Sequence, residues 1–202
     1  MDERLARADA IVFDVGNVLL RFDPDRVVTL LPEEHRAALA GVMFGTRHQW
    51  GRFDLGAESN EEIALSIASE AGVPGGEGMV LYALYHFHET MDRLPMYSLL
   101  PELRKAGKRL FALTNYPEPS FTFACRAFPY LTECLEGAVV SSREKLVKPE
   151  PAIFHFLTRK YDLIPSRTLF IDDTAANTDA AAREGFRVWH YAGKDRLQPA
   201  RS

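Results

Sequence analysis

Short apolar segments alternate with longer helical stretches along most of this chain, and this alternation limits the fold more than any other feature. Continuous apolar strands separated by helices are typical of a parallel sheet that is covered on both faces. Gly107 and Gly185 each lie just before such a segment, where a helix often ends in a left-handed residue. The sequence therefore predicts an α/β fold with a Rossmann-like parallel sheet core. Its predicted strands are residues 10–13, 109–113, 137–140, 168–171 and 186–191.

The segment between the first two predicted strands is far longer than one crossover needs. A crossover takes about a dozen residues, whereas residues 14–108 separate these two strands. The signals within this segment are helical. Asp23-Pro24 can begin a helix, and Ser59 with Glu62 fits a capping box. We expect a small inserted helical cap over residues 23–93 and a core domain formed by residues 1–22 and 94–202.

The composition is ordinary for a globular protein, and it limits the classes of partner. The chain has 202 residues, of which 47% are hydrophobic, so it can bury a sizeable core. No apolar run approaches the roughly 20 residues of a membrane helix, and the formal charge of −4 includes no basic block for nucleic acid. Cys125 and Cys134 lack metal-site spacing, so we expect reduced thiols. We expect a cytoplasmic protein with a small-molecule substrate, and the sequence has no signal for an oligomeric state.

Chemically useful side chains follow four of the predicted strands. In open α/β sheets, ligands bind beyond the carboxyl ends of the strands. Each residue taken alone fits a turn or a helix cap, but their joint occurrence at four strand ends predicts one site. The residues are Asp14, Thr114 with Asn115, Lys148, and Asp172 with Asp173.

This set of side chains suits phosphoryl transfer. Three neighbouring carboxylates repel one another unless a cation lies among them. Carboxylate oxygens with room for water and phosphate oxygens suit Mg²⁺. A lysine and a hydroxyl complete a cradle for a phosphoryl group, whose charge must be stabilised during transfer.

Taken together, the four strand-end motifs resemble the signature of the haloacid dehalogenase-like (HAD) hydrolases. The resemblance implies that Asp14 attacks phosphorus and forms an aspartyl-phosphate, which water then hydrolyses. It also implies that Lys148 neutralises the nucleophile and the transferred group, while Thr114 and the Asn115 backbone or amide hold phosphoryl oxygens. The implied Mg²⁺ ligands are Asp14, the backbone carbonyl of Gly16, Asp173 and, as a further carboxylate, Asp172.

One position departs from the family pattern. Phosphatases of this family usually place a second aspartate two residues after the nucleophile, where it acts as general acid and base, and this chain has Gly16. A positioned acid or base contributes about 10²- to 10⁴-fold to the rate. Residues 13–18, with Thr114-Asn115 and residues 148–151, resemble a HAD branch that includes α-D-glucose-1-phosphate phosphatases, where the same glycine occurs. We therefore expect a Mg²⁺-dependent phosphatase for a small metabolite, such as an anomeric sugar phosphate or an acyl phosphate.

Two other functions remain open. A 2-haloacid dehalogenase also uses an aspartate without the second acid, but the resembling dehalogenases have an aromatic residue in place of Gly16 and lack the paired acids Asp172 and Asp173. A catalytically weak HAD domain that binds a phosphorylated ligand or a protein partner also fits the loss of an acid.

The cap is the expected source of substrate contacts. Arg47 and Trp50 offer a cation and an aromatic platform near a turn flanked by Gly45 and Gly51. Three histidines of the same segment are candidates to replace the missing acid if the cap closes over the site. They are His48, His86 and His88.

Overall fold

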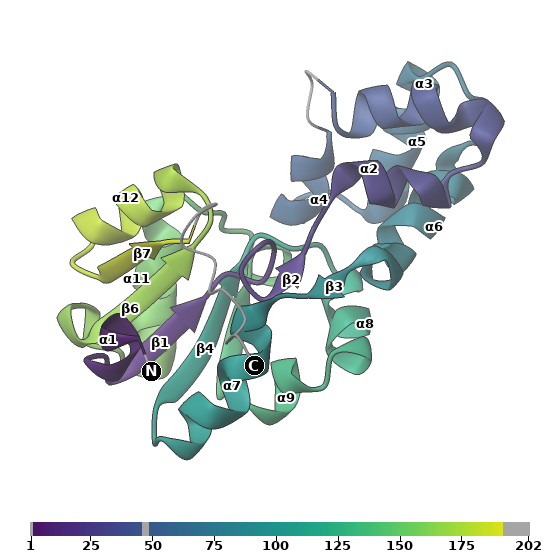
Figure 1. Cartoon of the computed structure of the whole chain (residues 1–202). Helices are drawn as coiled ribbons and strands as arrows, with labels where there is room; N and C mark the ends of the chain where they lie inside the picture. Colours follow the sequence, from purple (N-terminus) through teal and green to yellow (C-terminus); the bar gives the residue numbers. More distant parts are fainter. Residues whose placement is uncertain (1, 46–48, 192–202) are drawn as a thin grey trace.

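The computed structural model describes residues 2–45 and 49–191, and its centre is a five-stranded parallel sheet. The strands are β1 (Ala10–Phe13), β4 (Arg109–Thr114), β5 (Gly137–Val140), β6 (Thr168–Asp172) and β7 (Arg187–His190). Their order is β5-β4-β1-β6-β7, and every neighbouring pair is parallel. The predicted strands are confirmed with shifts of one residue at their ends. The α/β Rossmann-like fold is therefore as expected (Figure 1).

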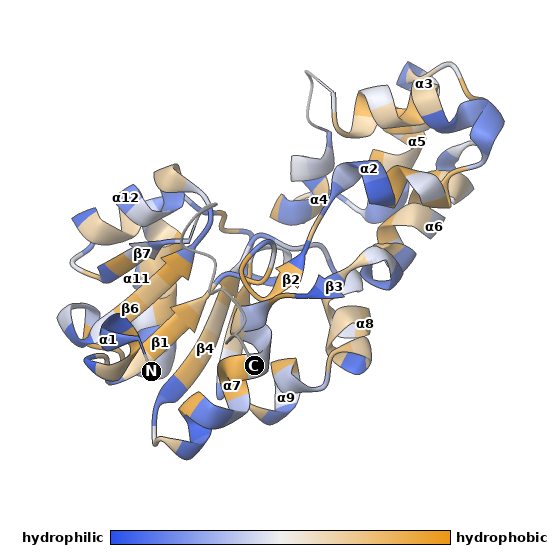
Figure 2. Ribbon diagram, viewed as in Figure 1, coloured by the Kyte–Doolittle hydropathy of each residue, from blue (hydrophilic) through white to orange (hydrophobic). Residues whose placement is uncertain are grey.

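Both faces of the sheet are buried, as the continuous apolar strands predict. Ile11 and Phe13 pack in one apolar cluster, whereas Ala10 and Val12 pack in a second cluster on the other face. Figure 2 shows the strands as mainly hydrophobic, while hydrophilic residues lie on the outer sides of the helices. The core helices are α1 (Glu3–Ala6), α7 (Pro95–Lys105), α8 (Ser120–Ala127), α9 (Tyr130–Glu133), α10 (Ser141–Glu144), α11 (Pro151–Tyr161) and α12 (Ala175–Arg183), with a 3-10 helix η3 (Pro165–Arg167).

A second group of helices is inserted between β1 and β4. The chain leaves the core through β2 (Leu20–Arg21) and returns through β3 (Asp92–Arg93), and these two short strands pair antiparallel. Figure 1 shows this pair between the sheet and the inserted helices. We propose that the pair marks the boundary between a core of residues 1–22 and 94–202 and a cap of residues 23–93. The inserted helices are α2 (Pro24–Val27), η1 (Val28–Leu30), α3 (Glu33–Met43), α4 (Trp50–Leu55), α5 (Asn60–Glu70), α6 (Glu77–His86) and η2 (Phe87–Thr90).

Local sequence signals set the ends of several helices. Asp23 caps α2 by accepting a hydrogen bond from the backbone N–H of Asp25, and Ser59 and Glu62 form the predicted capping box of α5. Gly107 before β4 and Gly185 before β7 have φ values of 78° and 86°. Both take the left-handed conformation that glycine tolerates. Cys125 and Cys134 are free thiols. Within the described part of the chain, every helix is too short or too polar to cross a bilayer.

Candidate active site

The carboxyl ends of the central strands bring the predicted site residues together. Because Phe13 pairs with Ala112 on one side and Ile171 on the other, Asp14 lies beside the ends of β4 and β6. The ammonium of Lys148 lies 2.9 Å from Asp14 Oδ1 and 2.7 Å from Asp172 Oδ2. Residues that are far apart in the sequence thus form one buried charge cluster.

Asp172 faces protein rather than solvent, and both oxygens of its carboxylate accept hydrogen bonds. Its oxygens accept hydrogen bonds from Asn177 Nδ2 at 3.0 and 3.1 Å, from the backbone N–H of Thr174 at 2.9 Å, and from Lys148. Its exposure is 0%, and it is absent from the walls of the pocket that Asp14 and Asp173 line. Asp172 therefore positions Lys148, and Asp173 is the paired acid that faces the pocket.

Asn115 holds the backbone of the lysine. Its Oδ1 accepts a hydrogen bond from the Lys148 N–H at 2.9 Å, and its Nδ2 donates to the Lys148 carbonyl at 3.0 Å. The side-chain amide is thus hydrogen-bonded at both ends, and Asn115 also lines the pocket of Asp14. Thr114 is 1% exposed at the end of β4 and is absent from the pocket walls.

Asn17 connects the loop after β1 to the acidic pair of β6. Its φ of 57° is left-handed, a conformation that asparagine tolerates better than most residues. Its Oδ1 accepts a hydrogen bond from the Phe22 N–H at 3.1 Å, and its side chain is also hydrogen-bonded to Asp173. This positioning role was not predicted from the sequence, although an asparagine after Gly16 is a recognisable turn signal.

The three carboxylates fit a divalent cation. One oxygen each from Asp14, Asp172 and Asp173 lies within 4.8 Å of the others. Burial raises the pKa of Asp14, against the opposing charge of Lys148, and burial together with the charge of Asp172 raises the pKa of Asp173. The site thus holds more negative charge than one lysine neutralises. Hard oxygen donors with excess negative charge are the environment that Mg²⁺ prefers.

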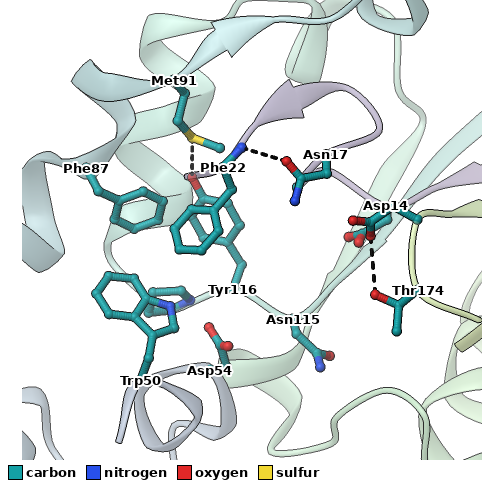
Figure 3. Close-up of a pocket in the computed structure, with 13 residues that line it drawn as sticks. Asp14, Asn17, Phe22, Trp50, Asp54, Phe87, Met91, Asn115, Tyr116 and Thr174 are labelled. Atoms are coloured by element: carbon teal, nitrogen blue, oxygen red, sulfur yellow. Dashed lines mark hydrogen bonds between the residues drawn. The ribbon is translucent and has the colours of Figure 1, made fainter. Parts of the chain in front are cut away.

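An aromatic wall faces the carboxylates across a pocket of about 200 Å³. The ring centroids of Trp50 and Phe87 are 5.4 Å apart, those of Phe22 and Phe87 are 5.7 Å apart, and those of Phe87 and Tyr116 are 5.2 Å apart. Figure 3 shows these rings on one side of the pocket, with Asp14 and Asn17 on the other. Trp50, predicted as an aromatic platform, is 8% exposed and lines the pocket.

The remaining cap predictions have different outcomes. Arg47 and His48 lie outside the described residues. His86 and His88, the other candidates to replace the missing acid, line a separate surface depression with Tyr85 and Phe123 and not the pocket of Asp14.

Asp54 is a pocket residue that the sequence analysis missed. It lies on α4 next to the predicted aromatic platform and lines the same pocket as Asp14 and Gly16. An isolated acidic residue in a helical segment has no local signal that distinguishes a pocket residue from a surface residue. Asp54 can be recognised as a pocket residue only from the packing of α4 against the core, which the sequence does not show.

Comparison with known proteins assigns the chain to a family. Residues 8–185 match the haloacid dehalogenase-like hydrolase family. The chain belongs to the HAD-like hydrolases. Its relatives include the sesquiterpene phosphatase astK of Aspergillus oryzae, which is 28% identical over 187 residues, or 90% of this chain and 88% of the relative.

Two further similarities extend over nearly the whole HAD chain. The D-ribitol-5-phosphate phosphatase of Bacteroides thetaiotaomicron is 27% identical over 188 residues, which cover 89% of each protein. A HAD family enzyme from the same organism, solved as a magnesium complex, superposes with a TM-score of 0.77 at 22% identity, covering 96% of this chain and 97% of the other. The second similarity confirms the fold.

Proposed function

We propose that this HAD hydrolase is a Mg²⁺-dependent phosphatase that acts on a small phosphorylated metabolite through an aspartyl-phosphate at Asp14. The observation that carries the proposal is the pairing of a pocket-facing aspartate with a buried lysine 2.9 Å away, beside a second pocket-facing carboxylate, Asp173. Relatives named as phosphatases support the same reaction class.

Each site residue has a separate task in the proposed reaction. One oxygen of Asp14 attacks phosphorus, and the bond from phosphorus to the leaving oxygen breaks. Lys148 remains beside Asp14 and offsets the charge of the nucleophile and of the transferred group. Thr114 and the backbone of Asn115 hold phosphoryl oxygens in this proposal, while the Asn115 amide and Asp172 fix the position of Lys148.

The metal ligands in this proposal are Asp14, Asp173 and the backbone carbonyl of Gly16, with Asp172 directly behind them. Bound Mg²⁺ would neutralise phosphoryl oxygens and orient the group for attack. Asn17 holds Asp173 in place through its side chain. Gly16 keeps its carbonyl for this task, although it has no side chain to move a proton.

We propose that the leaving group binds against the aromatic wall. Ring faces such as those of Trp50 and Phe87 accept either an apolar group or the C–H face of a sugar. The volume of about 200 Å³ favours a small leaving group. A sugar phosphate remains our first prediction, and the abundance of aromatic side chains makes an apolar alkyl phosphate the second candidate. The names of the two relatives, a sesquiterpene phosphatase and a D-ribitol-5-phosphate phosphatase, correspond to these two classes.

The two alternative functions have less support. A haloacid substrate carries a carboxylate, which Asp14 and Asp173 would repel in the absence of a cation. A catalytically weak domain would not require the closely fitted cluster of Lys148, Asn115 and Asp172. Both alternatives give clear outcomes in a turnover assay.

A substrate screen tests the proposal. We expect the purified chain to release phosphate from sugar phosphates, acyl phosphates or apolar alkyl phosphates with Mg²⁺, and to lose this activity with EDTA or in Asp14→Asn. Halide release from 2-haloacids without added metal would support the dehalogenase. Absence of turnover on every phosphate class would overturn the enzymatic proposal.

A further inference from the structure

The structure places a carboxyl group opposite the nucleophile, although the family position for the second acid is occupied by glycine. Asp54 reaches the pocket from α4, and Asp14 and Gly16 line the pocket from the core. Figure 3 shows the Asp54 carboxylate between the aromatic wall and Asn115, on the side of the pocket where the leaving group is proposed to lie. His86 and His88, by contrast, line another depression.

The carboxyl-terminal end of α4, which carries Asp54, contacts the core directly. Ser141 Oγ donates a hydrogen bond to the Asp54 carbonyl and accepts one from the Tyr116 N–H at 2.9 Å. At Gly56, where φ is 63°, an added Cβ would lie 2.5 Å from the Ser142 carbonyl oxygen, so the two backbones are in close contact. The position of Asp54 relative to Asp14 is therefore set by direct contacts between the cap and the core.

The surroundings of Asp54 favour a protonated carboxyl group. Burial raises its pKa to about 7, the negative charge of Asp14 acts in the same direction, and Lys148 opposes it. The phenol of Tyr116 also interacts with Asp54. Burial is the largest of these causes. An acid with a pKa near the working pH is well suited to donate and then accept a proton.

We propose that Asp54 is the catalytic acid and base of this site, in place of the aspartate that Gly16 lacks. The inference rests on the proposed phosphatase function. As Asp14 forms its bond to phosphorus, the leaving oxygen departs with the bonding pair and takes the proton of Asp54, which gives an alcohol and the Asp54 carboxylate. Water then attacks the aspartyl-phosphate, its proton passes to Asp54, and the bond between phosphorus and Asp14 breaks to release phosphate.

A series of aryl phosphates with graded leaving-group pKa tests this role. If Gly16 alone determined the chemistry, kcat/KM would fall steeply as the leaving-group pKa rises. With Asp54 as the acid, we expect a shallow slope in the unmodified protein. In Asp54→Asn we expect a steep slope, with a loss of about 10²- to 10⁴-fold for the most basic leaving groups and little loss for the least basic ones.

Two further variants make the test specific. Asp25→Asn removes an exposed cap carboxylate and is expected to leave the slope unchanged. Gly16→Asp introduced into Asp54→Asn is expected to restore a shallow slope, because a Cβ at Gly16 meets only the Phe22 Cβ at 3.8 Å, an ordinary contact.

The outcomes separate this inference from the proposed function. Absence of Mg²⁺-dependent turnover in the unmodified protein would overturn the phosphatase itself. Turnover with the same slope in Asp54→Asn would refute the role of Asp54 and leave the phosphatase intact. If Asp54→Asn does not fold, the unmodified chain and Gly16→Asp decide: a steep slope that Gly16→Asp flattens contradicts the inference, and a shallow slope in both supports it.

Discussion

Lys148 is the cation at the centre of the site, and only 1% of its side chain is exposed. Burial lowers its pKa, but the adjacent carboxylates of Asp14 and Asp172 more than compensate, so its pKa is raised and the ammonium stays charged. A buried pair of this kind contributes little compared with an apolar replacement of both partners, but removal of one partner leaves an uncompensated charge. Removal of Lys148 alone is therefore expected to destabilise the fold, because Asp14 and Asp172 would remain buried without their cation.

Lys148→Met is therefore expected to lower the free energy of unfolding by about 3 to 5 kcal/mol and to abolish turnover. The matched control is Lys160→Met, because Lys160 forms an ion pair with Glu144 on the surface at 2.9 Å. An exposed pair of this type contributes less than about 1 kcal/mol. Urea denaturation of both variants without metal measures the difference. Equal losses in the two variants would show that the buried cluster has no special role in stability.

At the scale of elements, the strands were predictable and the placement of the cap helices was not. Buried parallel strands are continuous apolar runs, so residues 10–13 and the positions after them could be identified without any tertiary information. The position of α4 involves long-range contacts such as the hydrogen bond from Ser141 to the Asp54 carbonyl, which joins residues 87 positions apart. No local pattern encodes such a contact, and for this reason Asp54 was missed.

Gly56→Ala tests whether the contact between α4 and α10 positions the pocket. Gly72→Ala is the matched control, because both glycines have positive φ, 63° and 67°, but a Cβ at Gly72 meets nothing within 4 Å. Each change places alanine in the left-handed region, at a cost of about 1–2 kcal/mol. We expect kcat/KM for aryl phosphates with basic leaving groups to fall by about 10²-fold in Gly56→Ala, because small displacements of reacting groups have effects of this size. Gly72→Ala is expected to keep its activity, and equal activity of both variants would argue against a positioning contact.

At the scale of the whole molecule, one apolar cluster extends from the sheet to the inserted helices. It includes Phe13 and Leu110 of the sheet together with Phe53 and Phe87 of the inserted segment. The pocket with its carboxylates lies at the junction of these two parts, so a cation bound there acts on a surface that both parts share. Metal binding is expected to stabilise the folded chain as a unit.

Addition of Mg²⁺ is thus expected to raise the Tm of the purified protein. A ligand at a concentration of 100 Kd stabilises the folded state by about 2.7 kcal/mol, which corresponds to roughly 5 to 10 °C for a chain of this size. The shift should be lost in Asp173→Asn, which removes a pocket-facing carboxylate, and retained in Asp25→Asn. Because the chain carries a net charge of −4, the comparison requires NaCl at the same ionic strength. An equal shift with NaCl, or in Asp173→Asn, would mean that Mg²⁺ acts by general screening and not at the three-carboxylate site.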